Sequence, residues 1–158
     1  MILDDFADFA AALPPMSALI GLDLGDKTIG VAVSDRIGAV ASPLETIRRK
    51  KFTLDAARLL EIIADREVGG ILLGLPRNMD GSEGPRCQST RAFARNLSRL
   101  TELPIGFWDE RLSTVAAERA LLEADTSRKR RAELIDNVAA SYILQGALDR
   151  MRHMRAEG

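Results

Sequence analysis

Two apolar segments joined by a tight polar turn lie near the start of the chain. Residues 18–25 and residues 28–34 consist mainly of Ala, Leu, Ile, Val and Gly, and Gly25-Asp26 has the composition of a hairpin turn. The second segment alternates apolar side chains with period two, which is typical of a β-strand. A third strand is predicted over residues 40–47. The first part of the chain is therefore expected to form an antiparallel meander of three strands.

Helices and strands alternate after this meander. Apolar residues recur at helical spacing over residues 54–67, and Gly69-Gly70 is expected to end that helix. Residues 71–75 are apolar throughout and predict a short strand. Residues 76–84 are rich in Gly, Asn, Asp and Ser and predict a loop.

The segment that begins at Pro85 predicts another helix, because proline is favoured in the first helical turn. Its inner stripe is expected to consist of Phe93, Leu97 and Leu100. An arginine recurs every four residues on another side, and these arginines are expected to face solvent: Arg91, Arg95 and Arg99. The apolar stripe would cover one face of the sheet.

One more strand and two more helices complete the pattern. The strand is predicted over residues 105–108. Ser113 or Thr114 can cap a helix that reaches about Glu123, and the last helix is predicted over residues 131–151. Together these elements predict an α/β fold with a mixed five-stranded sheet and helices on both of its faces.

Residues 1–16 are expected to be an N-terminal extension of a domain that spans residues 17–158. A short amphipathic helix is predicted over residues 1–13, and Pro14-Pro15 would end it. The extension contains three aspartates and no Lys or Arg, unlike the start of a secretory signal. With 158 residues, 46% of them apolar, the chain has the size and composition of a single domain.

Composition also excludes several kinds of protein. No apolar run approaches the roughly 20 residues that a membrane-spanning helix requires. Cys87 is the only cysteine and His153 the only histidine, so neither an internal disulfide nor a Cys/His zinc site is expected. These features favour a cytoplasmic protein without a membrane partner.

Two basic clusters contrast with a formal net charge of −1. They are Arg48-Arg49-Lys50-Lys51 and Arg128-Lys129-Arg130-Arg131. Local basic patches attract phosphate groups whatever the net charge of the chain, although such clusters are also common on solvated surfaces. The second cluster lies near Asp136, an acidic candidate for catalysis, and this favours a nucleic-acid contact there.

Three acidic residues lie close to the ends of predicted elements. Asp23 lies near the end of the first strand among apolar residues, Glu110 follows the strand over residues 105–108, and Asp136 lies in the first turns of the last helix. A buried carboxylate is costly unless it is protonated, paired or bound to a metal. A lone acid is more often a helix cap or a salt-bridge partner, so position alone identifies candidates only.

Four segments resemble, in order, the motifs of the YqgF (RuvX) family. They are GLDLGDKTIGVAVSD at residues 21–35, GLPRNMDGSEGP at residues 74–85, DERLST at residues 109–114, and IDNVAA with ILQ within residues 135–145. The resemblance covers residues 17–150, with Thr28 standing where arginine is common and Arg77 where an apolar residue is common. It implies an RNase H-like fold, similar to that of Holliday-junction resolvases. It also implies a nuclease that matures the 5′ end of pre-16S ribosomal RNA during ribosome biogenesis.

By this resemblance, Asp23, Glu110 and Asp136 are expected to be the catalytic and metal-binding triad, and Asp109 is an alternative to Glu110. The expected cofactor is Mg²⁺ or Mn²⁺, since carboxylate oxygens suit such ions. Cleavage of a phosphodiester builds negative charge on the phosphate and on the attacking and leaving oxygens, and two ions about 4 Å apart can stabilise it. Asp23 is expected to bridge the two ions, with Glu110 and Asp136 binding one each.

Contacts with a nucleic-acid substrate are expected around the triad. The candidates are Lys27 in the turn, Asn78 and Ser82 in the loop, Arg111, and the cluster Arg128, Lys129, Arg130 and Arg131. Asn78 and Ser82 are equally suited to making a loop, and Arg111 can pair with an acid instead. Phe107 and Trp108 are expected to belong to the core rather than to stack on bases.

Other functions are compatible with the sequence. A Holliday junction resolvase-like DNA nuclease would use the same triad, and a non-catalytic ribosome or transcription factor would only bind nucleic acid. Sugar kinases and actin-like ATPases also begin with Asp-x-Gly on a strand, but one domain of 158 residues lacks their second half. A junction cutter would act as a symmetric pair, so a dimer would favour DNA as the substrate and a monomer would favour RNA. The chain is expected to be a monomer or a weak homodimer.

Overall fold

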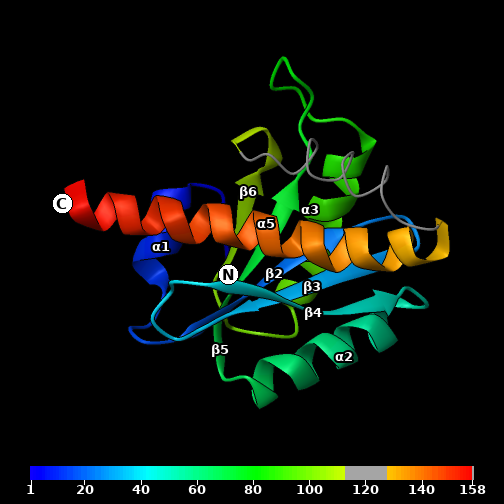
Figure 1. The fold of residues 1–158 in the computed structure, drawn as a ribbon, viewed down its shortest axis with the longest axis horizontal. Coiled ribbons are helices and arrows are strands. Elements are labelled where there is room, and N and C mark those ends of the chain that lie inside the picture. The colour runs from blue at the N-terminus through cyan, green and yellow to red at the C-terminus, as the bar shows by residue number, and fades with distance from the viewer. Residues whose placement is uncertain (113–127, 158) are drawn as a thin grey trace.

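A mixed sheet with helices on both faces forms the core of the structure (Figure 1). The computed structural model describes the backbone of residues 1–112 and 128–157, and the side chains of residues 1–112 and 137–157. Its elements are β1 (Ile2–Leu3), α1 (Phe6–Ala12), β2 (Ala18–Leu24), β3 (Thr28–Ser34), β4 (Ala41–Arg48), α2 (Phe52–Asp65), β5 (Val68–Leu75), α3 (Pro85–Ser98), β6 (Ile105–Asp109), the short 3-10 helix η1 (Glu110–Leu112) and α5 (Arg128–Glu157). Within the described residues, six strands form one sheet in the order β1-β6-β5-β2-β3-β4.

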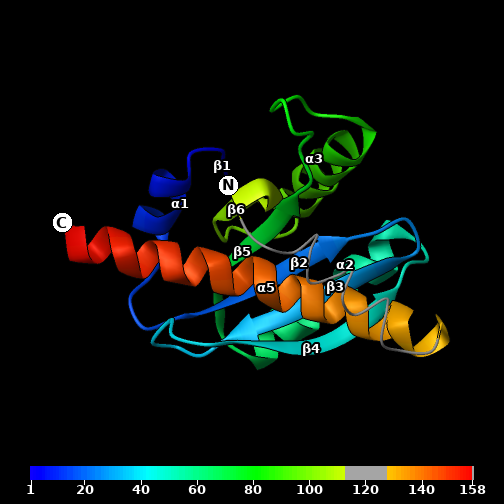
Figure 2. The same ribbon diagram turned by 45° about the horizontal axis from the view of Figure 1, so that its top comes forward.

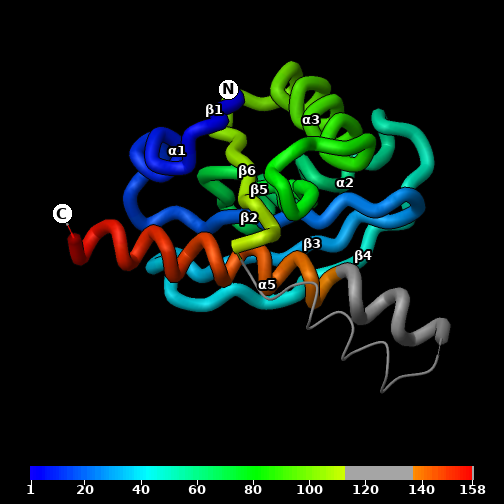
Figure 3. The backbone as a smooth tube through the Cα atoms, turned by 90° about the horizontal axis from the view of Figure 1, so that it is seen from above, coloured from blue at the N-terminus to red at the C-terminus, as the bar shows by residue number. Residues whose placement is uncertain are grey.

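The predicted meander is present as β2, β3 and β4, which pair antiparallel. The N–H of Gly25 closes the first turn by donating to the carbonyl of Thr28 at 2.8 Å. β5 pairs parallel with β2, and β6 pairs parallel with β5. Figure 3 shows α5 on one side of the sheet and α2 and α3 on the other. The predicted α/β class and the helices on both faces are therefore confirmed.

The predicted count of five strands is wrong by one, because the N-terminal segment adds β1 to the edge of the sheet. Ile2–Leu3 pairs parallel with the start of β6, Ile105 and Gly106. A strand of two residues has no periodicity to read, so the sequence predicted only a helix over residues 1–13. The helix that forms, α1, begins after Asp5, whose carboxylate accepts hydrogen bonds from the first turn.

The end of α2 also differs from the prediction. α2 ends at Asp65, and Glu67 takes a left-handed φ of 53° before β5 begins. Gly69 and Gly70 lie inside β5, where a Cβ on Gly70 would overlap the side chain of Leu13. The two glycines therefore permit close packing of the N-terminal segment and do not end the helix.

The helix α3 begins at the predicted proline, but its faces differ partly from the prediction. Phe93 and Leu97 are buried as expected, whereas Leu100 lies beyond the end of the helix and is 50% exposed. Arg91 does not point into solvent, because its guanidinium carbon lies 4.8 Å from the ring centroid of Phe107. Arg91 therefore belongs to the packed face of the helix.

The two faces of the sheet carry different cores. Aliphatic and aromatic side chains pack against α2 and α3 on one face, among them Ile20, Leu22, Ile71, Leu73 and Phe107. The other face lies beneath α5 and includes Leu19, Ala32, Leu72 and Trp108. Figure 2 shows α5 crossing this second face, with α1 beside its C-terminal half. A Cβ on Gly21 would lie 2.9 Å from the Cβ of Leu144, so α5 lies directly on the strand backbone.

The last helix is longer than predicted, since α5 extends beyond residues 131–151 at both ends. The helix predicted to begin at Ser113 or Thr114 lies outside the described residues. None of the helices in the described part of the chain is both long enough and apolar enough to cross a membrane.

Candidate functional site

Asp23 is a buried carboxylate at the end of β2, on the face of the sheet that α5 covers. It is 4% exposed and pairs in register with Gly30. Side chains alternate along a strand, so Asp23 shares a face with Gly21. A Cβ on Gly21 would meet Leu144 and the carbonyl oxygen of Ala140, both in α5. The carboxylate of Asp23 is therefore on the α5 side of the sheet.

Glu110 reaches the same face from the end of β6. Trp108, two residues earlier, packs in the core beneath α5. A Cβ on Gly74 in β5 would lie 3.4 Å from the carboxyl carbon of Glu110 and 2.5 Å from Cδ1 of Ile143 in α5. The carboxyl group of Glu110 thus lies over Gly74, where a larger residue would displace it.

Asp23 and Glu110 are brought to the same end of the same face. Leu22 in β2 pairs with Leu73 in β5, so the next residues along these parallel strands are Asp23 and Gly74. Neighbouring residues in a parallel pair point to the same face. Glu110, which covers Gly74, therefore lies beside the strand position that carries Asp23.

Asp136 and the second basic cluster cannot be placed in the same way. They lie in the first part of α5, and their side chains, Arg128, Lys129, Arg130, Arg131 and Asp136, are outside those that the structure describes. Within the described residues, no group of three Asp, Glu, His or Cys side chains is arranged to hold a metal ion. The convergence of all three predicted acids therefore stays a prediction.

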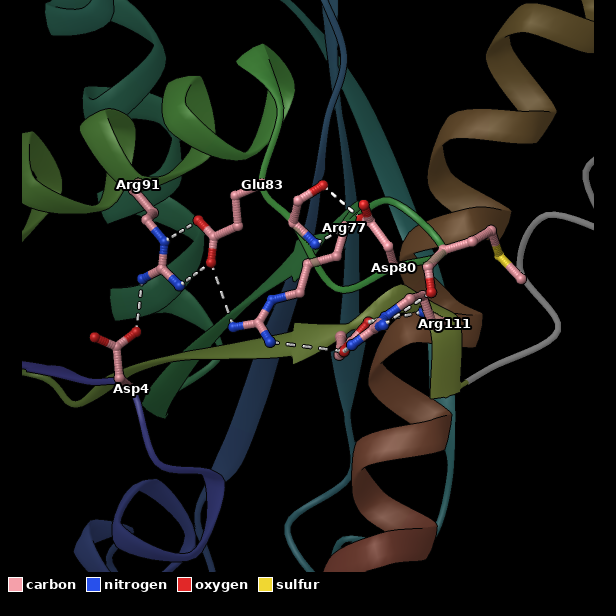
Figure 4. A network of polar contacts seen from close by, with 9 residues as sticks. Asp4, Arg77, Asp80, Glu83, Arg91 and Arg111 are labelled. Carbon is pink, nitrogen blue, oxygen red and sulfur yellow. Dashed lines mark hydrogen bonds and ion pairs between the residues drawn. The ribbon is translucent and has the colours of Figure 1, made fainter.

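Asp109 is held by arginines. Its carboxylate accepts from Arg111, with Nη2 at 2.7 Å and Nε at 3.1 Å, and Arg77 lies 3.9 Å away (Figure 4). The hydrogen bonds from Arg111 hold the pKa of Asp109 below its usual range. Asp109 follows Phe107 by two residues, so it lies on the face of the sheet opposite Trp108. The structure thus pairs Asp109 with arginines and places it on the face of the sheet opposite Glu110.

The loop between β5 and α3 is held by its own polar side chains. Nδ2 of Asn78 donates to Oγ of Ser82 at 3.0 Å, and this hydroxyl donates to Oδ1 of Asp80 at 2.6 Å. Nη1 of Arg111 donates to the carbonyl of Met79 at 3.4 Å. Asn78 and Ser82 therefore shape the loop, and both remain exposed to solvent.

An ion-pair chain at the base of this loop was not foreseen from the sequence. Arg91 donates to both carboxylate oxygens of Glu83, at 2.6 and 2.7 Å, and to Asp4 at 2.6 Å (Figure 4). Nη2 of Arg77 lies 3.4 Å from Oε2 of Glu83, the oxygen that also accepts from Nη2 of Arg91. The hydrogen bonds from Arg91 lower the pKa of Glu83. Asp4 and Arg91 are 87 residues apart, and nothing in the local sequence indicates that they meet.

The turn between β2 and β3 carries Lys27, whose side chain is exposed. The carbonyl of Lys27 accepts from the N–H of Arg49 at 2.8 Å, which ties the turn to the end of β4. Lys27 is therefore positioned by its backbone next to the end of β2 and is separated from Asp23 by three residues.

Comparison with known proteins gives consistent matches along the chain. A family described as "RuvX: Holliday junction resolvase" matches residues 17–150. A protein of Ruegeria sp. strain TM1040, named "Putative pre-16S rRNA nuclease", is 86% identical over 156 residues, which cover 99% of each chain. A protein of Ruegeria pomeroyi with the same name is 78% identical and covers 98% of this chain and 100% of its own.

Comparison of folds identifies RuvC of Thermus thermophilus as a structural neighbour. The two structures superpose with a TM-score of 0.54, covering 85% of this chain and 96% of RuvC. Their sequences are only 16% identical, so the likeness concerns the fold. It confirms the RNase H-like architecture expected from the sequence.

Proposed function

The chain belongs to the RuvX family, and from this membership we propose that it is a metal-dependent endonuclease that processes the 5′ end of pre-16S ribosomal RNA. The name carried by the relatives supports this substrate. Precursor rRNA is made and matured in the cytoplasm of bacteria, so the proposal includes a cytoplasmic location. We also propose that its partner is a nucleic acid and that the protein is a monomer or a weak homodimer.

The observation that carries the proposal is the placement of Asp23 and Glu110. Both reach the α5 face at the carboxyl ends of strands, which is where open α/β sheets assemble their sites. Two carboxylates close together repel each other unless a cation or a proton lies between them. A divalent cation shared by Asp23, at 4% exposure, and Glu110 would offset this cost.

We propose Asp136 as the third acid of the site. The helical turn from Ala140 to Leu144 lies over Gly21, and α5 runs from the end of β2 toward its start, where Met151 lines a pocket with Ser17. Asp136 lies one turn before Ala140. Moving back four residues along a helix covers about 6 Å and returns to the same helix face. Moving from residue 21 to residue 23 along the strand covers about 6.6 Å in the same direction. The sequence spacing thus supports Asp136 as the partner of Asp23.

Mg²⁺ or Mn²⁺ fits this set of donors, because both ions prefer carboxylate oxygens. Asp23, Glu110 and Asp136 would hold the metal. Bound there, divalent ions would stabilise the negative charge that develops on the scissile phosphate and on the attacking and leaving oxygens. The carboxylates therefore serve as anchors, and neither Cys87 nor His153 is needed for the reaction.

Polar side chains around the acids would position the substrate. Lys27 in the turn and the cluster at residues 128–131 supply positive charge for phosphate groups. Asn78 and Ser82 are exposed on a loop whose conformation is held by their own hydrogen bonds. They can therefore contact the phosphate backbone of the nucleic acid without a change in the loop. Arg111 supports this loop through Met79 while it pairs with Asp109.

The deciding experiment compares two substrates side by side. Wild-type protein and the Asp23→Asn variant are incubated with precursor 16S rRNA and with a four-way DNA junction, in Mg²⁺. We expect the wild type to shorten the 5′ end of the RNA, and the variant to bind RNA without cleaving it. Equal cleavage by both proteins would reject the acidic site.

The same experiment tests the second candidate, a DNA resolvase, which the description of the matched family favours. Cleavage of the junction without cleavage of the RNA, by a protein that is dimeric in solution, would support it. RNA binding that is equal in chelator and in Mg²⁺, without any product, would support a non-catalytic binding protein.

A further inference from the structure

We propose that a basic pocket beside the turn between β2 and β3 binds a backbone phosphate of the substrate. The pocket has a volume of about 390 Å³, and its polar lining includes Arg49, Lys50, Arg86 and Ser89. The inference rests on the proposed function in one respect, namely that the substrate is a nucleic acid. It adds a phosphate site that is separate from the acidic residues and from the substrate contacts named above.

Three segments far apart in the sequence form the pocket. They are the turn after β2, the end of β4 and the first turns of α3. Arg49, Lys50 and Arg86 bring three cations to it, against one carboxylate, Asp26. Cations gathered at one point of a surface hold a phosphate group by electrostatic attraction.

The two arginines are fixed in place by the end of β2. Nη1 of Arg49 donates to the carbonyl of Gly25 at 2.6 Å, and Nη2 of Arg86 donates to the carbonyl of Leu24 at 3.2 Å. A guanidinium carries five N–H donors, and each of these bonds uses one of them. Anchored side chains lose less conformational entropy when a ligand binds, so the remaining donors are ready for phosphate oxygens.

The N-terminus of α3 also favours an anion in the pocket, independently of the arginine side chains. Its N-cap is Gly84, which has no side chain to accept hydrogen bonds from the first turn, and Pro85 follows it. The N-terminus of a helix of 14 residues carries a partial positive charge that favours anions. Ser89, exposed one turn further along α3, adds a hydroxyl donor at the rim of the pocket.

The position of the pocket fits a substrate that also reaches the acids. Leu24, whose carbonyl holds Arg86, directly follows Asp23. Leu24 packs with α3 on the face of the sheet opposite α5, so the acid and the pocket flank the same strand end. A nucleic-acid strand that crosses this end could place one phosphate at the acids and another in the pocket.

The test is a binding measurement in chelator, where no cleavage occurs. A fluorescently labelled single-stranded RNA oligonucleotide is titrated with the full chain at several salt concentrations, and anisotropy is recorded. For Arg86→Ala we expect weaker binding, with a slope of log affinity against log salt that is smaller by about 0.7 to 1. The loss should be the same for two oligonucleotides of unrelated sequence, because phosphate contacts carry no sequence information.

Two further variants keep the test decisive. Ser89→Glu places a negative charge at the rim and leaves the arginines intact, so it should weaken binding even if Arg86→Ala unfolds the protein. Arg95→Ala removes the same charge from an exposed position on α3 outside the pocket, and should bind nearly as the wild type does. Wild-type affinity and slope for both pocket variants, or an equal loss for Arg95→Ala, would overturn the inference.

The outcome separates this inference from the proposed function. If both pocket variants bind RNA normally while Asp23→Asn abolishes cleavage, the phosphate pocket is wrong and the nuclease stands. If the pocket variants bind weakly while Asp23→Asn cleaves normally, the pocket stands and the acidic site is wrong.

Discussion

Gly74 determines how closely Glu110 and α5 approach the sheet. A Cβ at this position would meet Ile143 at 2.5 Å and the carboxyl carbon of Glu110 at 3.4 Å, so even alanine does not fit without movement. We expect Gly74→Ala to destabilise the protein by about 1–3 kcal/mol and to reduce cleavage, because Ile143 must move and with it the part of α5 that covers the proposed site. Urea unfolding and a cleavage assay measure the two effects.

A glycine in open surroundings provides the control for this change. The nearest atom to a Cβ on Gly84 would be Nδ2 of Asn78 at 3.7 Å, an ordinary contact. Gly84→Ala should therefore leave cleavage close to the wild-type level. Equal activity of the two alanine variants would show that the proposed site does not depend on the packing of α5 over Gly74.

Asp109 and Glu110 are adjacent in sequence but have different surroundings, and substitution should separate their roles. Glu110→Gln is expected to reduce cleavage by more than about a hundredfold with little change in stability. Asp109→Asn should retain most activity and lose about 1–2 kcal/mol of stability, because it weakens the charged hydrogen bonds from Arg111. Cleavage rates and urea unfolding of both variants check this, and the reverse pattern would make Asp109 the ligand.

At the level of elements, the N-terminal segment is part of the core. Phe9 of α1 is fully buried, and its ring occupies the space that a side chain on Gly106 of β6 would need. We expect Phe9→Ala to cost about 3–5 kcal/mol of stability, measured by urea unfolding. Asp8→Asn changes an exposed neighbour on the same helix and should stay within about 0.5 kcal/mol of the wild type. A small effect of Phe9→Ala would mean that α1 is not packed on the sheet.

The loop before α3 should make stability depend on pH. The pKa of Glu83 is lowered in the folded protein by Arg91, and that of Asp109 by Arg111. A carboxyl whose pKa is depressed on folding stabilises the fold when ionised, above its unfolded pKa of about 4, and this contribution is lost as pH falls through the lower folded pKa. Stability should therefore fall on acidification below about pH 4.

Removal of one carboxylate isolates this effect. Glu83→Gln should lower stability near neutral pH and reduce the fall on acidification, as seen by urea unfolding at about pH 7 and about pH 3. Glu102→Gln removes an exposed carboxylate outside the loop and should keep the wild-type profile. An unchanged acid profile for Glu83→Gln would mean that its pairing with Arg91 contributes nothing to folding.

Most elements could be predicted because each carries its own signal in the sequence. Strands β2, β3, β5 and β6 are apolar runs between turn residues, and α3 begins at a proline. The two-residue β1 has no such signal, and it forms only because Ile105 of β6 offers an unpaired edge. Gly69-Gly70 predicts a helix end, because the local sequence does not indicate that Leu13, which is distant in sequence, packs against Gly70.

For the whole molecule, the division of the sheet into two faces determines which acids can meet. Motif resemblance named Asp23, Glu110 and Asp136, but the choice between Glu110 and Asp109 depends on the face that each residue takes after β6. The sequence alone does not decide between Glu110 and Asp109, because two adjacent residues at a strand end are equally plausible metal ligands. Packing of Glu110 over Gly74 favours Glu110.

The two proposed sites lie on opposite faces of the sheet. On the α5 side, Asp23 and Glu110 form the proposed reaction site. On the other side of the same strand end, Arg49 and Arg86 form the proposed phosphate pocket. A substrate that spans this end would be held on both sides, and this would let a chain with net charge −1 bind nucleic acid.

Metal binding without substrate tests the central claim most directly. Mn²⁺ is titrated into the protein and the free ion is followed by electron paramagnetic resonance, for the wild type and for Asp23→Asn, Glu110→Gln, Asp136→Asn and, as a control, Asp26→Asn. We predict that the wild type and the control bind Mn²⁺ alike, that Asp23→Asn loses binding, and that Glu110→Gln and Asp136→Asn are each weakened. Wild-type binding by all three triad variants, or no binding by the wild type, would contradict a shared metal site.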